Sequence, residues 1–182
     1  LAKCAERGDL GKPEVLAEQA TRMLGDPKAK ALATQFAGQW FKFNGFETNA
    51  TPDTEMFPEF DERLAEAMYR ESLMFFDEIF RNDRSILEIL QADYTFANER
   101  LADHYGIEGV RGDAFQRVVL PESRRMGVLS HGSFLISTSQ PQRTSPVQRG
   151  VWVMEEILGR HIPTPPPNVP ELSKEETDAN GL

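Results

Sequence analysis

The sequence contains a single cysteine, Cys4, among its 182 residues. One thiol excludes an internal disulfide and a zinc site built from several cysteines. It also excludes the Cys-x-x-Cys-His pattern that attaches c-type haem, so we expect this chain to carry no covalent haem. Histidine is scarce as well, and His104, His131 and His161 are too far apart to predict a metal site by spacing.

Basic residues and long apolar runs are also in short supply. The chain has 20 Lys and Arg against 29 Asp and Glu, a formal net charge of −9. This balance argues against a general affinity for nucleic acid or anionic membranes. No apolar run approaches the roughly 20 residues of a membrane-spanning helix. The chain begins without Met or a signal-peptide pattern, and we interpret it as a piece of a longer protein.

Helical periodicity is the signal that the sequence has in abundance. Pro13 suits the first turn of a predicted helix that stops at Gly25. In a second predicted helix Leu32, Phe36 and Trp40 recur at helical spacing. The spacing predicts that these three side chains face the core, where truncating Phe36 to alanine would cost roughly 3–5 kcal/mol.

The longest predicted helix runs from Glu59 to Arg81 and carries Leu64, Phe75 and Ile79 on its apolar face. We expect it to share a core with the second helix.

Two later segments also carry local signals of secondary structure. A helix is predicted to begin at Asp93 or Thr95 and to end at Gly106. The run FQRVVL, residues 115–120, is strand-like but short and isolated, so no sheet is predicted from it.

These patterns predict an all-α fold in two parts. Residues 1–120 form a helical domain. Residues 121–182 form a smaller, irregular helical segment that ends in a proline-rich extended tail.

The most specific segment is RTSPVQRG, residues 143–150. Ser145 is predicted to cap a helix whose first residue is Pro146. Arg143 and Arg149 flank that helix start, so both guanidinium groups could hold an anion on one side of it. Two alternatives stay open: the arginines pair with carboxylates of this chain, or they hold an anionic ligand.

The charge distribution favours the first alternative. Fourteen acidic residues lie between Asp53 and Asp103, against five arginines. Seven arginines lie between Arg111 and Arg160, against four acidic residues. The second part of the chain could therefore face the acidic helices of the first part.

His131 lies among glycine and small residues in LSHGSF. Such a position can bring an imidazole to a ligand or a metal, although a hydrogen-bonded structural role is the more common use. The paired carboxylates lie on polar helix faces, and SHGS lacks the strand–turn–helix context of a nucleophilic serine. The sequence therefore contains no catalytic constellation and assigns no enzymatic reaction.

Five strings in one order carry a family resemblance: DPKAKALATQFAGQWFKF, FPEFDERLAEAMYRES, ADYTFANERLADHYGI, RRMGVLSHGSFL and RTSPVQRGVWVMEEILGRHIPTPPPNVPEL. Together they resemble the paired domains of unknown function in planctomycete-type cytochrome-c-associated multidomain proteins. The resemblance covers nearly the whole chain, with residues 1–120 as the C-terminal portion of the family's first domain. The second domain begins near Arg124 and contains the R-T-S-P-V-x-R-G motif.

The resemblance implies an exported protein of the periplasm or cell envelope. Haem c would belong to the full-length protein, in Cys-x-x-Cys-His segments of neighbouring domains, and not to this chain. Those neighbouring domains, a haem domain among them, are the partners that it implies. It makes Arg143, Arg149 and His131 candidates for a place beside a haem, at its propionates or at an axial position.

We therefore expect a non-catalytic module that shapes or docks a neighbouring cytochrome-c-type domain. The alternative is a structural or binding module for an envelope partner or a polysaccharide.

Overall fold

A computed structural model describes residues 1–46, 52–120 and 126–163. Within these ranges the chain is mostly helical, as the sequence predicts, with one two-stranded sheet in addition. The proline-rich tail lies outside the described residues, and the predicted boundary after residue 120 borders the gap at 121–125. Among the helices that are described, none is long and apolar enough to cross a membrane.

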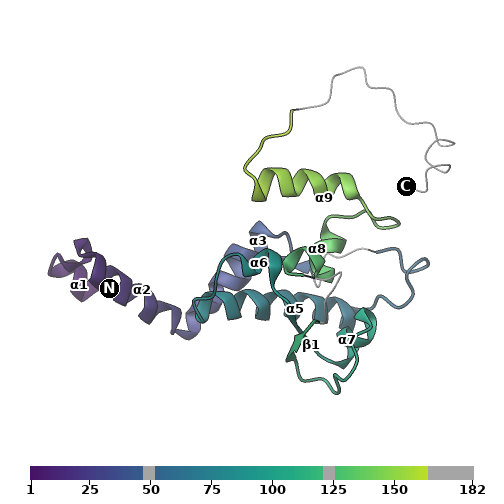
Figure 1. Cartoon of the computed structure of the whole chain (residues 1–182), viewed down its shortest axis with the longest axis horizontal. Helices are drawn as coiled ribbons and strands as arrows, with labels where there is room; N and C mark the ends of the chain where they lie inside the picture. The colour runs from purple at the N-terminus through teal and green to yellow at the C-terminus, as the bar shows by residue number, and fades with distance from the viewer. Residues whose placement is uncertain (47–51, 121–125, 164–182) are drawn as a thin grey trace.

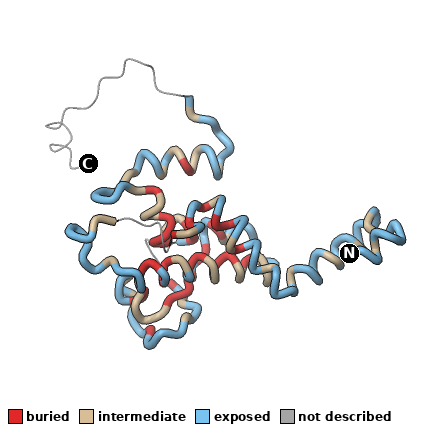
Figure 2. The backbone as a smooth tube through the Cα atoms, turned by 180° about the vertical axis from the view of Figure 1, so that it is seen from behind, coloured by how far each residue is buried: buried red, intermediate tan, exposed pale blue. Residues whose placement is uncertain are grey.

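The body of the molecule is built around α5, Glu62–Arg81. Its start is set by Asp61, whose side chain accepts a hydrogen bond from the backbone N–H of Leu64 at 2.7 Å. The helix is central in Figure 1, and the buried part of the chain gathers around it in Figure 2. Its buried side chains are Leu64, Ala65, Ala67, Met68, Glu71, Ser72, Phe75, Phe76 and Ile79. The predicted core positions of this helix are thus confirmed.

Short elements surround α5. Those that precede it are η2 (Pro27–Ala29), the π-helical η3 (Leu32–Ala37) and α3 (Gly38–Trp40). Those that follow it are α6 (Glu88–Gln91), β1 (Tyr94–Ala97), α7 (Glu99–Tyr105), β2 (Gln116–Val119), η4 (Val128–Ser130), α8 (Gly132–Ser137), α9 (Pro146–Trp152) and the π-helical η5 (Val153–Ile157).

The N-terminal elements form an arm that projects from the body (Figure 1). They are α1 (Ala2–Glu6), η1 (Asp9–Gly11) and α2 (Pro13–Leu24). The helix α2 begins and ends as predicted, but its apolar side chains Leu16 and Met23 are exposed. Residues 1–24 are all described and none of them is buried, which Figure 2 shows as an arm without red.

The segment after the arm corrects one prediction. Ala33, Ala37 and Phe41 are buried, whereas Leu32 and Phe36 are exposed. Apolar residues cover a wide face of this segment, so their spacing alone does not determine which of them are buried. The π-helical η3 has longer i→i+5 turns, which rotate the side chains relative to those of an α-helix. Leu32 and Phe36 therefore do not line the core, and Trp40 does so only in part.

The chain also forms a sheet that the sequence patterns do not predict. β1 and β2 pair antiparallel, with Tyr94 opposite Val119 and Ala97 opposite Gln116. All four residues of β1 are buried, because the aromatic and β-branched YTFA run packs against α5. The isolated strand-like run thus finds its partner about 20 residues earlier in the chain.

The pairing of β1 moves the start of the following helix. Asn98 caps α7 and accepts a hydrogen bond from the backbone N–H of Leu101 at 3.1 Å. The predicted caps Asp93 and Thr95 are therefore wrong. The predicted stop is confirmed, since Gly106 follows α7 with a left-handed φ of 68° that favours glycine.

The segment after residue 125 packs into the same core as the first part. Trp152 lies with its ring centroid 5.1 Å from Phe41 and 4.7 Å from Phe134. The chain enters this region through Gly127, where any side chain would collide with the carbonyl oxygen of Ile89. Elements from both sides of the predicted boundary thus share one hydrophobic cluster.

A comparison of Phe41 with Phe36 tests which side chains of this segment are buried. Phe41 is fully buried, whereas 54% of Phe36 is exposed. We predict that Phe41→Ala lowers the free energy of unfolding by roughly 3–5 kcal/mol, because it removes a ring from a close-packed site. Phe36→Ala should cost about 1 kcal/mol or less. Urea-induced unfolding measures both, and equal losses would contradict the described packing.

Candidate functional site

A buried polar cluster crosses the core, consisting of Glu71, Ser72, Thr95, Tyr105, His131 and Ser133. Its centre is the carboxylate of Glu71, which is 1% exposed. Thr95 donates its hydroxyl to Oε1 of this carboxylate, and Tyr105 donates its hydroxyl to Oε2 at 2.7 Å. The Tyr105 oxygen also accepts the backbone N–H of Gly132 at 2.7 Å. The cluster therefore links α5, β1, α7 and α8.

His131 belongs to the other end of this cluster. Its Nδ1 lies 3.0 Å from the hydroxyl of Ser72, which in turn lies 2.7 Å from the hydroxyl of Ser133. Its Nε2 lies 4.0 Å from the Glu71 carboxylate, and its ring packs edge-on against Phe75. With 2% of its surface exposed, the imidazole lies within the core, in the hydrogen-bonded arrangement that is the more common use of such a histidine.

Glu71 was not singled out by sequence reasoning, because it resembles the many other acidic residues of α5. A signal was present nevertheless. Glu71 follows Met68 by three residues and precedes Phe75 by four, which places it on the apolar face of the helix. A lone carboxylate in that stripe indicates a buried polar contact.

A cavity of about 540 Å³ opens elsewhere, between residues 42–46, 52–60 and 135–149. We call it the Lys42 cavity. Part of its wall is apolar and is formed by Phe46, Phe57, Phe60, Met68, Leu135 and Ile136. Its charged lining residues are Lys42, Glu59, Arg143 and Arg149, and His104 also lines it. Both arginines of the RTSPVQRG segment thus reach one cavity, whereas His131 does not line it.

The two arginines are held by neutral groups. Arg149 donates Nε to the hydroxyl of Thr138 at 3.4 Å, and Nη2 to the hydroxyls of Ser139 and Thr144 at 3.4 and 3.2 Å. Arg143 donates Nε to the side-chain oxygen of Gln140 at 2.9 Å. Within the described ranges no carboxylate lies at ion-pair distance from either guanidinium group. The expected pairing with the acidic helices therefore finds no support there.

The local helix start agrees with the prediction. Pro146 is the first residue of α9, and the hydroxyl of Ser145 accepts the backbone N–H of Gln148 at 3.4 Å. Residues before the cap, among them Ser139 and Thr144, line the Lys42 cavity, and so does Arg149 within α9. The helix start thus lies between the two arginines that reach this cavity.

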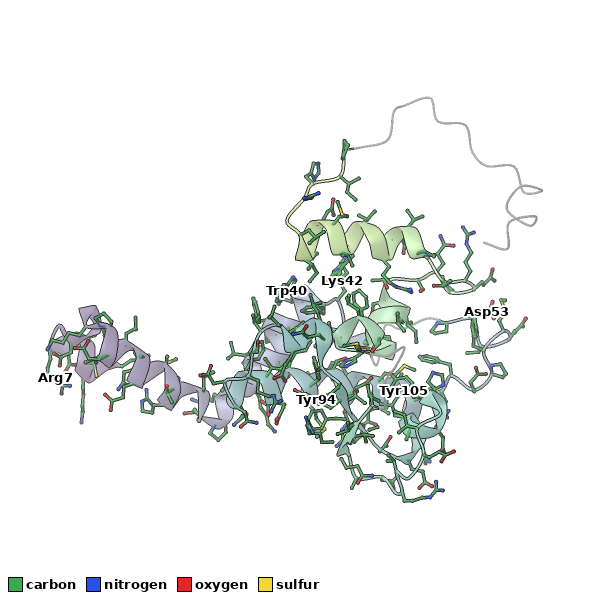
Figure 3. All side chains as sticks on the ribbon, viewed as in Figure 1. Arg7, Trp40, Lys42, Asp53, Tyr94 and Tyr105 are labelled. Atoms are coloured by element: carbon green, nitrogen blue, oxygen red, sulfur yellow. The ribbon has the colours of Figure 1, made fainter. Side chains whose placement is uncertain are left out.

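Lys42 has an unusual backbone. Its φ of 58° lies in the left-handed region, where a non-glycine residue is strained. Phe41 separates the residue from the end of α3, and the Lys42 side chain lines both the Lys42 cavity and a second cavity of about 240 Å³ under α9. Figure 3 shows Lys42 on the side of the body that α9 covers. Strain of this kind clusters at ligand and active sites.

Asp53 connects the loop before α5 to the loop at the rim of the Lys42 cavity. Its carboxylate accepts the side-chain amide of Gln142 at 2.9 Å, and its backbone N–H donates to the carbonyl of Pro141 at 2.9 Å. The Gln142 amide, with the backbone N–H groups of Glu55 and Met56, holds the pKa of Asp53 below its ordinary value. The loop before α5, where Figure 3 labels Asp53, is thus tied to the loop that carries Arg143.

The described residues contain no group of three or more His, Cys, Asp or Glu side chains placed to hold a metal ion. What the arrangement does provide is a cavity with a partly apolar wall and three cations, Lys42, Arg143 and Arg149, none of which forms an ion pair with a carboxylate of the described residues. Such a hollow can bind an anion or an anionic group of a partner.

Comparisons with known proteins agree with the resemblance. Residues 1–107 match the model of PSD4, described as a protein of unknown function (DUF1592). Residues 125–181 match the model of PSCyt3, described as a protein of unknown function (DUF1588). Both are planctomycete-type cytochrome-c-associated domains, which confirms the predicted pairing of two such domains. No curated protein and no solved structure matches the chain.

The buried polar cluster predicts a large effect for one hydroxyl. Tyr105→Phe leaves both the Glu71 carboxylate and the Gly132 N–H without that partner, so we expect a loss of about 2–4 kcal/mol in the free energy of unfolding. Tyr94→Phe is the control, because it removes one hydrogen bond to the partly exposed Glu88 and should cost about 1 kcal/mol. Urea-induced unfolding measures the difference, and a smaller loss for Tyr105→Phe than for Tyr94→Phe would refute the role of the cluster.

The hydrogen bonds that Asp53 accepts predict that the contact between Asp53 and Gln142 depends on pH. Because the pKa of Asp53 is lower in the folded protein than in the unfolded chain, its stabilising contribution is complete above about pH 4. It is lost as the pH falls through the lower, folded pKa. We expect the side-chain amide resonances of Gln142 in NMR spectra to stay constant from neutral pH to about pH 4 and to shift below it. Asp53→Asn should abolish the shift, and a titration near neutral pH would contradict the assignment.

Proposed function

This chain belongs to the PSD4 family of proteins of unknown function, and we propose that it docks a neighbouring cytochrome-c-type domain of the same polypeptide. It is a module without chemistry of its own. One observation carries the proposal: Arg143 and Arg149 line a cavity with apolar walls and are hydrogen-bonded there to neutral groups. A carboxylate at the edge of a partner, a haem propionate among them, would complete their charge.

The residues of this chain do not fit a covalently attached haem. Attachment through two thioether bonds needs two cysteines, and Cys4 is the only one, located on the projecting arm. Haem c therefore belongs, in this proposal, to the neighbouring domain, where it supplies electron transfer. The residues described above only bind and orient that domain.

The three candidate residues receive different roles. Arg143 and Arg149 contact the partner, because they line the open cavity. His131 is a positioning residue, since it is buried in the core and anchors the start of α8 next to Ser72. The C-terminal half of α8 and the residues after it form part of the cavity wall, so the position of α8 affects how the arginines are held.

Export belongs to the same proposal. The cytochrome-c association of both domain families supports a periplasmic or envelope location for the polypeptide. We propose that location together with the docking role.

The docking proposal is tested by binding to the neighbouring cytochrome-c-type domain of the full-length protein, produced separately. We predict that Arg143→Ala together with Arg149→Ala weakens binding by at least about 10-fold at low salt, since two charge-assisted contacts are lost. Raising the ionic strength to about 0.5 M should weaken binding of the unaltered chain as well. Isothermal titration calorimetry measures both effects.

Arg22→Ala together with Arg111→Ala is the matched control. It removes the same charge from two exposed positions that do not line the cavity. This control should bind within about 2-fold of the unaltered chain. Equal binding by the two double variants would overturn the proposal. Binding to an envelope polysaccharide, but not to the haem domain, would instead favour a binding module of the envelope.

A further inference from the structure

We infer that the Lys42 cavity recognises a carboxylate carried on an apolar body, and that Lys42 is a charged ligand of that carboxylate. The inference deepens the docking proposal by naming the chemical group that the cavity accepts. It depends on that proposal only for the identity of the partner. The recognition itself follows from the residues around the cavity.

The cavity combines two kinds of surface. Among the described lining residues, Lys42, Arg143 and Arg149 supply three cations against the single carboxylate of Glu59, so this lining favours an anion. Guanidinium groups offer parallel N–H donors that match the planar geometry of a carboxylate. The aromatic and aliphatic wall, which includes Phe57, excludes water and suits an apolar body.

This combination selects against inorganic anions. Phosphate and sulfate are strongly hydrated on all sides, so contact with an apolar wall costs them hydration that no wall residue replaces. A carboxylate on an apolar body exposes only one charged end. The volume of about 540 Å³ lies in the range of small-molecule sites, so a ring or a short chain fits beside the charged end.

The backbone of Lys42 is the second, independent observation. Only Lys42 and Asp83 combine a side chain with a left-handed φ among the residues that the structure describes. Each follows the end of a helix, a position at which glycine is preferred because it has no Cβ. Glycine at position 42 would relieve the strain but would remove the ammonium group from the cavity. A role in binding would account for lysine at position 42, where glycine would be less strained.

Arg149 is also positioned to bind a carboxylate in the cavity. Three hydroxyl groups, those of Thr138, Ser139 and Thr144, hold its guanidinium group in place without neutralising it. A ligand carboxylate then meets an arginine whose side-chain entropy is already reduced. Among the side chains that the structure describes, Gln140 is the one that accepts a hydrogen bond from Arg143, so Arg143 is the more adaptable of the two.

The test uses 3-phenylpropionate as the probe and its neutral amide, 3-phenylpropanamide, as the matched compound. Isothermal titration calorimetry and NMR chemical shifts on the whole chain measure binding. We expect the carboxylate to bind at least about 10-fold more tightly than the amide, because only the carboxylate meets the cations. Inorganic phosphate at the same ionic strength should not displace it. Equal affinity for the acid and the amide, or displacement by phosphate, would overturn the inference.

Two glycine variants separate binding from folding. Lys42→Gly and Asp83→Gly relieve the same kind of backbone strain, but only position 42 lines the cavity. We expect both variants to keep or raise the thermal unfolding midpoint, and only Lys42→Gly to weaken binding of 3-phenylpropionate, by about 5-fold or more. Lys42→Asn, which tolerates the same backbone region, should repeat the loss if the glycine variant folds poorly. Unchanged binding by a folded Lys42 variant would refute its role.

The two proposals fail in distinguishable ways. Binding of 3-phenylpropionate without binding of the cytochrome-c-type domain supports the inference and refutes the docking function. Arginine-dependent docking of that domain without binding of any carboxylate probe supports the function and refutes the inference.

Discussion

A carboxylate buried at the centre of α5 is the constraint on which the rest of the structure depends. Glu71 lies in the middle of an aromatic core, where an unpaired carboxyl group would cost several kcal/mol. Its oxygens are satisfied by hydroxyl groups from β1 and α7, and the Tyr105 hydroxyl passes the connection on to the backbone of Gly132. These contacts connect α5 with β1, α7 and α8, so the relative positions of the four elements determine whether this group is satisfied.

The shape of the Lys42 cavity depends on that arrangement. Because the start of α8 is held by Tyr105 and by the Ser72–His131 contact, its C-terminal end is placed so that Leu135 and Ile136 line the cavity. The residues that follow α8, Thr138 and Ser139, hold Arg149 there. The buried polar cluster thus contacts the start of α8, and the Lys42 cavity lies at its C-terminal half. His131 and the arginine pair, which the family resemblance named together, are connected through this helix although His131 does not line the cavity.

Sequence patterns predicted what depends on near neighbours in the chain. The cap at Ser145, the stop at Gly106 and the buried face of α5 follow from residues within a few positions, and all three are confirmed. The sheet was missed because its strands are about 20 residues apart and neither is convincing alone. The exposed Phe36 was misplaced because periodicity assumes an α-helix, whereas the π-helical η3 turns its faces differently. For the candidate site, the sequence predicted the two arginines and their common side, but not Lys42, whose signal is a backbone angle.

The arrangement around Lys42 links stability to binding. Lys42 has a strained backbone, and neither arginine has a carboxylate partner within the part of the chain that the structure describes. Each feature leaves the folded chain less stable than an alternative that is easily reached, such as glycine at position 42 or an acidic residue beside Arg149. Three such features around one cavity are difficult to explain by folding alone. They are explained if the missing negative charge comes from outside the chain. The PSD4 and PSCyt3 segments then form one surface, since Lys42 lies in the first and both arginines lie in the second. The pairing of the two domains is in that case a requirement of the site, because neither domain contains all of its cations.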